Sequence, residues 1–303
     1  MAERPPLMPV RRPRGPSKEE IRRRRLAALG AIVAAVIVFV IAVVVALPHV
    51  SGKSSPTTTA LAAPRPFKII FPEGFTRAQM TQRVGVVAKI AENKSHKNVV
   101  LAPRTYVNAS HRAVLPCFTP HRQTNLEGFL FPATYDFLAT TTSRELVQDQ
   151  LQAFCENWSQ VNLSYAKKKN LTPYDVLIIA SMVEKEALAP DERPLVAAVI
   201  YNRLHAHMTL GIDATLRYGL DIPGTKSILE SQLQSDNPYN SRKLPGLPPT
   251  PIANPGLASI QAAAHPAKVD YLYFVRKPDK QHHFFTASAS AFAQYECAHG
   301  YGC

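Results

Sequence analysis

Two glutamates, Glu184 and Glu186, stand at the end of a long apolar segment and are the first candidates for chemistry. Residues 176–183 before them are apolar almost without interruption. A carboxylate beside such a segment is costly to bury unless it is paired, hydrogen-bonded or protonated. A carboxyl group that stays protonated near neutral pH can act as a general acid. The pattern therefore predicts an acid–base residue, with a pair of surface carboxylates as the alternative.

A helix predicted over 171–188 must position these two carboxylates. Thr172 is expected to cap it, with Pro173 at the first helical position. At about 100° per residue, Glu184 and Glu186 lie about 160° apart around the helix axis. Because apolar side chains cover most of the remaining circumference, we expect a deeply buried helix with one glutamate toward a cleft. The periodicity does not choose between the two.

Polar and aromatic residues downstream suit a saccharide cleft. Sugar hydroxyls bond to Asn, Asp and Arg side chains, and sugar faces pack on aromatic surface. The candidates for substrate binding are Asn202, Arg203, Asp213, Thr215, Tyr239 and Asn240. The histidines lack the spacing of a zinc site, and the sequence has no phosphate-binding loop. We therefore expect neither a metal nor a cofactor.

The remaining sequence mixes helical and strand patterns, which predicts an α+β fold. Helices are expected over 76–91, 143–155, 192–205 and 257–264, the second capped by Ser143, and strands over 67–71, 271–275 and 283–286. The last two strands are expected to pair, and residues 236–256 form a proline-rich loop. The strand, turn and helix within 67–115 make a small module, which either binds a substrate or partner or only packs against the rest.

The N-terminal region predicts a membrane anchor. The net charge of the 303 residues is +13, and residues 1–25 hold nine basic side chains against three acidic ones. Residues 26–47 carry no polar side chain and would span about 33 Å as a helix, enough for a bilayer core. The basic cluster before them places the N-terminus in the cytoplasm and the rest outside. A cleaved signal peptide is the alternative, although its apolar region is usually only about 7–15 residues.

Four cysteines follow the predicted span, at Cys117, Cys155, Cys297 and Cys303. The oxidising compartment expected there permits two disulfides, which four cysteines can form in three ways. Cys297 with Cys303 would close a short loop and leave Cys117 with Cys155. Free, buried cysteines are the alternative.

Six stretches occur in the order found in one family. They are Leu126–Pro132 with Thr134-Tyr135, Ala180–Glu186, Val199–Leu204, Gly246–Pro249, Pro251–Gly256, and Ala263–Lys268 running into Tyr271–Val275. On these motifs the chain resembles the MltG-type, or YceG-like, endolytic murein transglycosylases over about 125–287. It departs from the family pattern at Gly211, where a glutamine is usual, and at Arg242, where a tyrosine is usual.

The resemblance implies cleavage of peptidoglycan between N-acetylmuramic acid and N-acetylglucosamine without water, which would terminate nascent glycan strands. It implies that Glu186 protonates the glycosidic oxygen and then takes a proton from the muramoyl 6-hydroxyl, leaving a 1,6-anhydro end. A hydrolase would usually need a second carboxylate about 5–10 Å away. Glu184 points to nearly the opposite side of the helix, and Asp213 stays open for that role.

The resemblance also implies a domain order. A basic cytoplasmic tail (1–25) and a transmembrane helix (26–47) lead through a flexible linker (48–66) to a LysM-like module (67–120) and the catalytic domain (121–303). The partners implied are peptidoglycan strands, the cell membrane and peptidoglycan synthases, with no nucleic acid, because almost half the positive charge belongs to the N-terminal tail. The alternative is a membrane-anchored, peptidoglycan-binding scaffold with little turnover.

Overall fold

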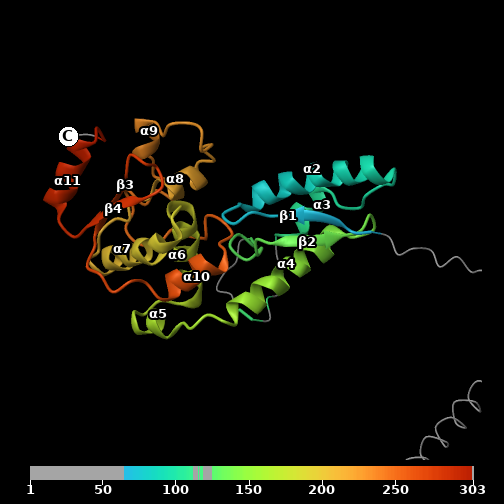
Figure 1. Ribbon diagram of the computed structural model, residues 1–303, viewed down its shortest axis with the longest axis horizontal. Coiled ribbons are helices and arrows are strands. Elements are labelled where there is room, and N and C mark those ends of the chain that lie inside the picture. Colours follow the sequence, from blue (N-terminus) through green and yellow to red (C-terminus); the bar gives the residue numbers. More distant parts are fainter. Residues whose placement is uncertain (1–64, 112–114, 116, 119–124, 302–303) are drawn as a thin grey trace, which may run out of the picture. The chain divides into compact units, whose positions relative to one another are not determined.

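The computed structural model describes residues 65–111, 115, 117–118 and 125–301. Its helices and two small antiparallel sheets confirm the predicted α+β fold (Figure 1). The predicted anchor over 26–47 lies outside the described residues. Among the helices that the structure does describe, none combines the length and the apolar character needed to cross a bilayer.

The first part of the described chain is a β–α–α–β unit. It consists of β1 (Phe67–Ile70), α2 (Arg77–Ser95), α3 (Pro103–Ala109) and β2 (Thr134–Phe137). The two strands pair antiparallel, with Ile69 opposite Tyr135. Thr76 caps α2 as expected, in a capping box with Gln79. The partner of β1 therefore comes from beyond residue 120, where the small module was expected to end.

The second part is mostly helical and ends in a hairpin and a helix. Its elements are α4 (Ser143–Trp158), α5 (Ser164–Lys168), α6 (Pro173–Glu186), a 3-10 turn (Pro190–Glu192), α7 (Arg193–His205), α8 (Asp213–Gly219), α9 (Glu230–Leu233), α10 (Leu257–Ala264), β3 (Tyr273–Arg276), β4 (His283–Thr286) and α11 (Ala289–Ala298). Strands β3 and β4 pair antiparallel as expected, with Phe274 opposite Phe285. The expected cap of α4 is wrong: Thr142 caps it, because its capping box with Glu145 leaves the Ser143 side chain to bond Ala102.

Helix α6 lies in the core and is the element that positions the two glutamates. Every residue from Val176 to Val183 is buried, as the apolar sequence predicts. Helices α7, α8 and α10 pack against α6, an arrangement that Figure 1 shows around the yellow-green α6 ribbon. Burying a Leu or Ile side chain contributes about 1.5–3 kcal/mol. The packing of these buried side chains therefore stabilises α6 and fixes the position of its C-terminal end, where Glu186 lies.

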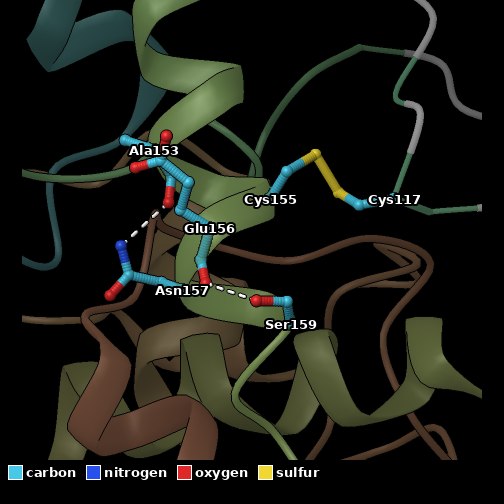
Figure 2. The surroundings of a disulfide bond; sticks show 6 residues. All are labelled: Cys117, Ala153, Cys155, Glu156, Asn157 and Ser159. Carbon is cyan, nitrogen blue, oxygen red and sulfur yellow. Dashed lines mark hydrogen bonds between the residues drawn. A yellow bond between two sulfur atoms is a disulfide. The ribbon is translucent and has the colours of Figure 1, made fainter.

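A disulfide joins Cys117 to Cys155 on α4 (Figure 2). Beyond Cys155 in the chain, Asn157 donates a hydrogen bond to the carbonyl of Ala153, and Ser159 donates one to that of Glu156. Cys297 is also disulfide-bonded. Its expected partner, Cys303, lies outside the described residues. The Cys117–Cys155 pairing is confirmed.

Replacing both Cys117 and Cys155 with alanine is expected to lower the free energy of unfolding by about 2–4 kcal/mol. The bridge closes a loop between cysteines that are 38 positions apart, and its loss frees the unfolded chain more than the folded one. Denaturant titration under non-reducing conditions measures the change. An equal stability of the double variant and the parent protein would contradict this expectation.

Candidate active site

The end of α6 is built as the sequence predicts. Thr172 caps the helix in a capping box with Asp175, and Pro173 occupies the first turn, where a missing N–H has no cost. Glu186 is the last residue of the helix. An acidic side chain here emerges directly from the buried core.

The two glutamates have different surroundings. Glu186 is half-buried and lines a large cleft. Glu184 does not line this cleft, and its Oε2 accepts a hydrogen bond of 3.0 Å from the backbone N–H of Gly256. Burial and the Glu184 charge raise the pKa of Glu73, which places Glu73 and Glu184 close together. The helical periodicity predicted that one of the two glutamates faces a cleft, and Glu186 is that residue.

The cleft around Glu186 has a volume of about 1310 Å³. Its lining comes from the start of α2, the 125–127 segment, the end of α6, the 209–214 loop, α8, Arg242, the β3–β4 hairpin and α11. Pockets for single small molecules are typically about 300–1,000 Å³. The cleft is therefore large enough for a stretch of polymer.

The environment of Glu186 suits proton transfer near neutral pH. Burial raises the pKa of its carboxyl to about 7. The charge of Arg276, a hydrogen bond from the backbone N–H of Ala214 and the charge of Lys185 lower this pKa, whereas the charge of Asp213 raises it. A group with such a pKa is present in both protonation states at pH 7, so it can give and take a proton.

Two of the six expected substrate-binding residues share the cleft with Glu186. Asp213 lies near enough for its charge to act on Glu186, and its Oδ1 accepts a 2.6 Å hydrogen bond from Arg242 Nε. Arg203 lines the cleft too, but its Nε donates to the carbonyl of Leu272 and its Nη1 to that of Leu210. Arg203 thus ties the 209–214 loop to the segment before β3, and Asp213 remains the carboxylate that neighbours Glu186.

The other four expected residues do not line the cleft. Asn202 donates to the carbonyls of residues 269 and 271 and lines a separate hollow of about 550 Å³. Thr215 and Asn240 are fully buried and bond to loop groups around 212, 233, 235 and 241. The hydroxyl of Tyr239 bonds to that of Thr250. All four brace loops, and their contact with substrate stays a prediction.

Sequence reasoning missed a second buried carboxyl group in the cleft lining, that of Glu127. Its side chain is 3% exposed and accepts hydrogen bonds from the N–H of Arg77, the hydroxyl of Tyr218 and the amide of Asn254. Burial outweighs these hydrogen bonds and raises the pKa of Glu127 to about 7. The signal available in the sequence was a single acidic residue within the otherwise apolar stretch 126–132. No cluster of metal ligands occurs in the described part of the chain.

Glu186 lines a cleft of about 1310 Å³ and has a pKa raised to about 7, so it is a candidate acid–base residue on an α+β scaffold. The chain belongs to the YceG-like family, whose model matches residues 51–296. This confirms the resemblance seen in the motifs.

Relatives with assigned names support the same family. The chain is 36% identical over 219 residues to the endolytic murein transglycosylase of Bacillus subtilis (strain 168), covering 70% of this chain and 59% of the relative. It is 33% identical over 242 residues to the endolytic murein transglycosylase of Streptococcus pneumoniae (strain R6), covering 74% of this chain and 42% of the relative. The chain thus spans about half the length of these relatives.

A solved structure shares the fold. The crystal structure of a YceG-like protein from Listeria monocytogenes superposes with a TM-score of 0.65 at 27% sequence identity. The similarity covers 77% of each chain. It extends to more than the six motifs, since it includes most of the described residues.

Proposed function

We propose that this chain is an endolytic lytic transglycosylase that cleaves peptidoglycan between N-acetylmuramic acid and N-acetylglucosamine. The observation that carries the proposal is the half-buried Glu186, with a pKa raised to about 7, in a cleft of about 1310 Å³. The names of the relatives from Bacillus subtilis and Streptococcus pneumoniae support murein as the substrate.

In the proposed reaction Glu186 acts twice. Its protonated carboxyl gives a proton to the glycosidic oxygen as the bond from that oxygen to the anomeric carbon breaks. The resulting carboxylate then takes the proton of the muramoyl 6-hydroxyl while the oxygen of that hydroxyl bonds to the anomeric carbon. The products are two shorter strands: one carries the new free hydroxyl and the other carries the 1,6-anhydro end. Glu186 is protonated again, and no water is consumed.

The groups around Glu186 suit both steps. Burial and the Asp213 charge favour the protonated carboxyl that the first step needs. Arg276, the Ala214 N–H and Lys185 favour the carboxylate that the second step needs. Opposed influences of this kind keep the two protonation states close in free energy, as a residue that alternates between acid and base requires.

Analysis of the ends left in digested sacculi tests this function. The proposal predicts new 1,6-anhydro-muramoyl ends, detected by mass spectrometry. New reducing ends would instead indicate a hydrolase that uses Asp213 as its second carboxylate. No new ends would indicate the scaffold alternative. Either of the last two results would contradict the proposal.

The pH dependence of the reaction is expected to follow Glu186. Because the first step needs the protonated carboxyl, kcat/KM should fall about tenfold per pH unit above a pH of about 7. Asp213→Asn removes a charge that raises the pKa of Glu186. The variant should therefore lose activity at a lower pH than the parent. If the pH at which activity falls is unchanged or higher in Asp213→Asn, the assignment of this pH dependence to Glu186 is contradicted.

We also propose that residues 26–47 anchor the chain in the cell membrane, with the N-terminus cytoplasmic and the catalytic domain outside. The uninterrupted apolar sequence after a basic cluster supports this orientation. In the same proposal the β1–α2–α3–β2 unit is the LysM-like module. Peptidoglycan synthases remain the proposed partners of the whole chain.

A further inference from the structure

Arg276, the last residue of strand β3, lines the same cleft as Glu186. Its backbone lies opposite that of His283 in the β3–β4 pair. The carboxylate of Glu192 holds His283 twice: Oε1 accepts the backbone N–H of His283 at 2.8 Å, and Oε2 lies 2.7 Å from its Nδ1. Both side chains of this pair are buried. Strand β4 is therefore fixed to the residue that precedes α7.

Strand β3 is fixed to α7 as well. Arg203 on α7 donates a 2.6 Å hydrogen bond from Nε to the carbonyl of Leu272, the residue two positions before Phe274. The guanidinium of Arg203 also lies over the ring of Tyr273, 5.4 Å from its centroid. Both strands of the hairpin thus have contacts to α7, and the backbone that carries Arg276 is already in place before a ligand binds. Such preorganisation lowers the entropic cost of binding.

The cleft lining within the described part of the chain contains six basic side chains, and five of them bond to the protein itself. Four of the five donate to backbone carbonyls and the other pairs with the carboxylate of Asp213; these five are Arg77, Lys185, Arg203, Arg217 and Arg242. The sixth is Arg276, whose guanidinium makes no hydrogen bond and no salt bridge to any residue that the structure describes. Its side chain is exposed, so its five N–H donors are available to a ligand.

The chemistry of the proposed substrate indicates which ligand this is. A guanidinium binds a carboxylate through two parallel N–H donors. The sugar hydroxyls and acetamido groups of a glycan strand are uncharged, and the lactoyl groups of its muramoyl residues are amide-linked to peptide stems. The carboxylates that enter the cleft with such a strand therefore belong to the stems.

We propose that Arg276 binds a carboxylate of the peptide stem on a muramoyl residue in the cleft. The hairpin then selects strands that carry acidic stems, while Glu186 cleaves the glycosidic bond. The inference names a feature of the substrate and rests on the proposed function.

A second effect of Arg276 has to be separated from this contact. Burial raises the pKa of Glu186, and the charge of Arg276 is the largest influence that lowers it. Replacing Arg276 therefore changes the protonation of Glu186 as well. That change alters the activity on every strand by the same factor, whereas the loss of a carboxylate contact depends on the strand. A comparison of two substrates isolates the contact.

The test uses purified stem-bearing glycan strands and the same strands after carbodiimide and ammonia have converted their carboxylates to amides. In the full-length, detergent-solubilised chain, Arg276→Gln should raise KM for the unmodified strands about three- to tenfold. For the amidated strands KM should be the same in Arg276→Gln and in the parent, because the contact is already lost. Arg276→Lys keeps the charge but not the planar fork, so it should restore part of the preference for unmodified strands.

A binding measurement gives a readout besides activity. The dissociation constant of fluorescently labelled strands is measured by anisotropy with chains that also carry Glu186→Gln, which is expected to leave the strands intact. Arg276→Gln should raise this Kd for unmodified strands by the same three- to tenfold factor as KM, and should leave the Kd of amidated strands unchanged.

Lys280→Gln is the matched control. Lys280 is an exposed cation in the turn of the same hairpin and lies outside the cleft lining. Its replacement removes the same charge and should leave the preference for unmodified strands at the parent value. If Lys280→Gln lowers this preference as much as Arg276→Gln does, general attraction between charges explains the preference and the inference is overturned.

The inference is also overturned if Arg276→Gln weakens the two substrates by the same factor, or weakens neither. The proposed function still stands in that case, provided that the parent forms 1,6-anhydro ends and Glu186→Gln does not. If the parent forms no such ends, the proposed function fails, and the Kd comparison decides whether Arg276 binds a carboxylate. If Glu186→Gln keeps full activity, the proposed function fails too, and the KM comparison decides.

Discussion

Glu186→Gln is expected to lower kcat for the cleavage of glycan strands by about 10³-fold. The amide cannot donate the proton that the glycosidic oxygen must receive, and general acid–base groups typically contribute about 10²–10⁴-fold. The side chain keeps its shape, and the carboxyl that it replaces is costly to bury as a charge, so the melting temperature should not fall. Release of soluble muropeptides from sacculi, measured against time, gives the rate.

Glu184→Gln is the matched control for this experiment. Glu184 sits two residues earlier on the same helix, and its amide variant can still accept the hydrogen bond from Gly256. Its kcat should stay within about threefold of the parent, as for most changes outside the reacting groups. Equal losses in the two variants would mean that the end of α6 serves the fold and that neither carboxyl transfers the proton.

Asn254→Ala is expected to destabilise the protein by about 3–6 kcal/mol, the largest stability effect that we predict. The Asn254 side chain is 0% exposed. Its Oδ1 accepts hydrogen bonds from the N–H groups of Gly128 and Leu130, and its Nδ2 donates to the carbonyl of Phe75 and to Glu127. Alanine leaves the buried N–H groups of Gly128 and Leu130 without their acceptor, and each unmet group costs about 1–3 kcal/mol. The carbonyl of Phe75 and the carboxyl of Glu127 each lose one of their hydrogen bonds as well.

Asn202→Ala provides a graded comparison for Asn254→Ala. Asn202 is half-buried and makes two hydrogen bonds, both to backbone carbonyls. Its loss should cost about 1–2 kcal/mol. Urea titration of both variants measures the difference in the free energy of unfolding. We infer that Asn254 joins the 72–75 turn, the 127–130 segment and the 251–256 loop. If Asn254→Ala proved as stable as Asn202→Ala, or more stable, this inference would be contradicted.

Local features of the fold were predictable from the sequence. The cap at Thr172, the proline at the start of α6 and the buried run up to Val183 depend on neighbours within the same helix, so spacing alone reveals them. The bounds of α10 and the pairing of β3 with β4 follow from the same kind of local signal. The disulfide between Cys117 and Cys155 was one of three possible connectivities, and a short loop at the C-terminus favoured it.

The parts that depend on distant partners were not predictable. β1 pairs with a strand that begins 64 positions beyond its own last residue, at Thr134, so no local pattern marks the partner. Glu127 meets Tyr218 across 91 positions and Asn254 across 127. A polar side chain in a motif can serve either substrate or fold, and residue type does not distinguish the two. For this reason Thr215 and Asn240 were reasonable candidates for the cleft, and the structure shows both side chains fully buried and bonded to loop groups.

The most direct test of the central claim is cleavage of purified glycan strands in water enriched in ¹⁸O, followed by mass spectrometry of the new ends. The account predicts 1,6-anhydro ends without ¹⁸O from the parent chain, and almost no new ends from Glu186→Gln. The nucleophile in this account is the muramoyl 6-hydroxyl, so solvent oxygen never enters the product. Reducing ends that carry ¹⁸O, or anhydro ends formed at the parent rate by Glu186→Gln, would contradict it.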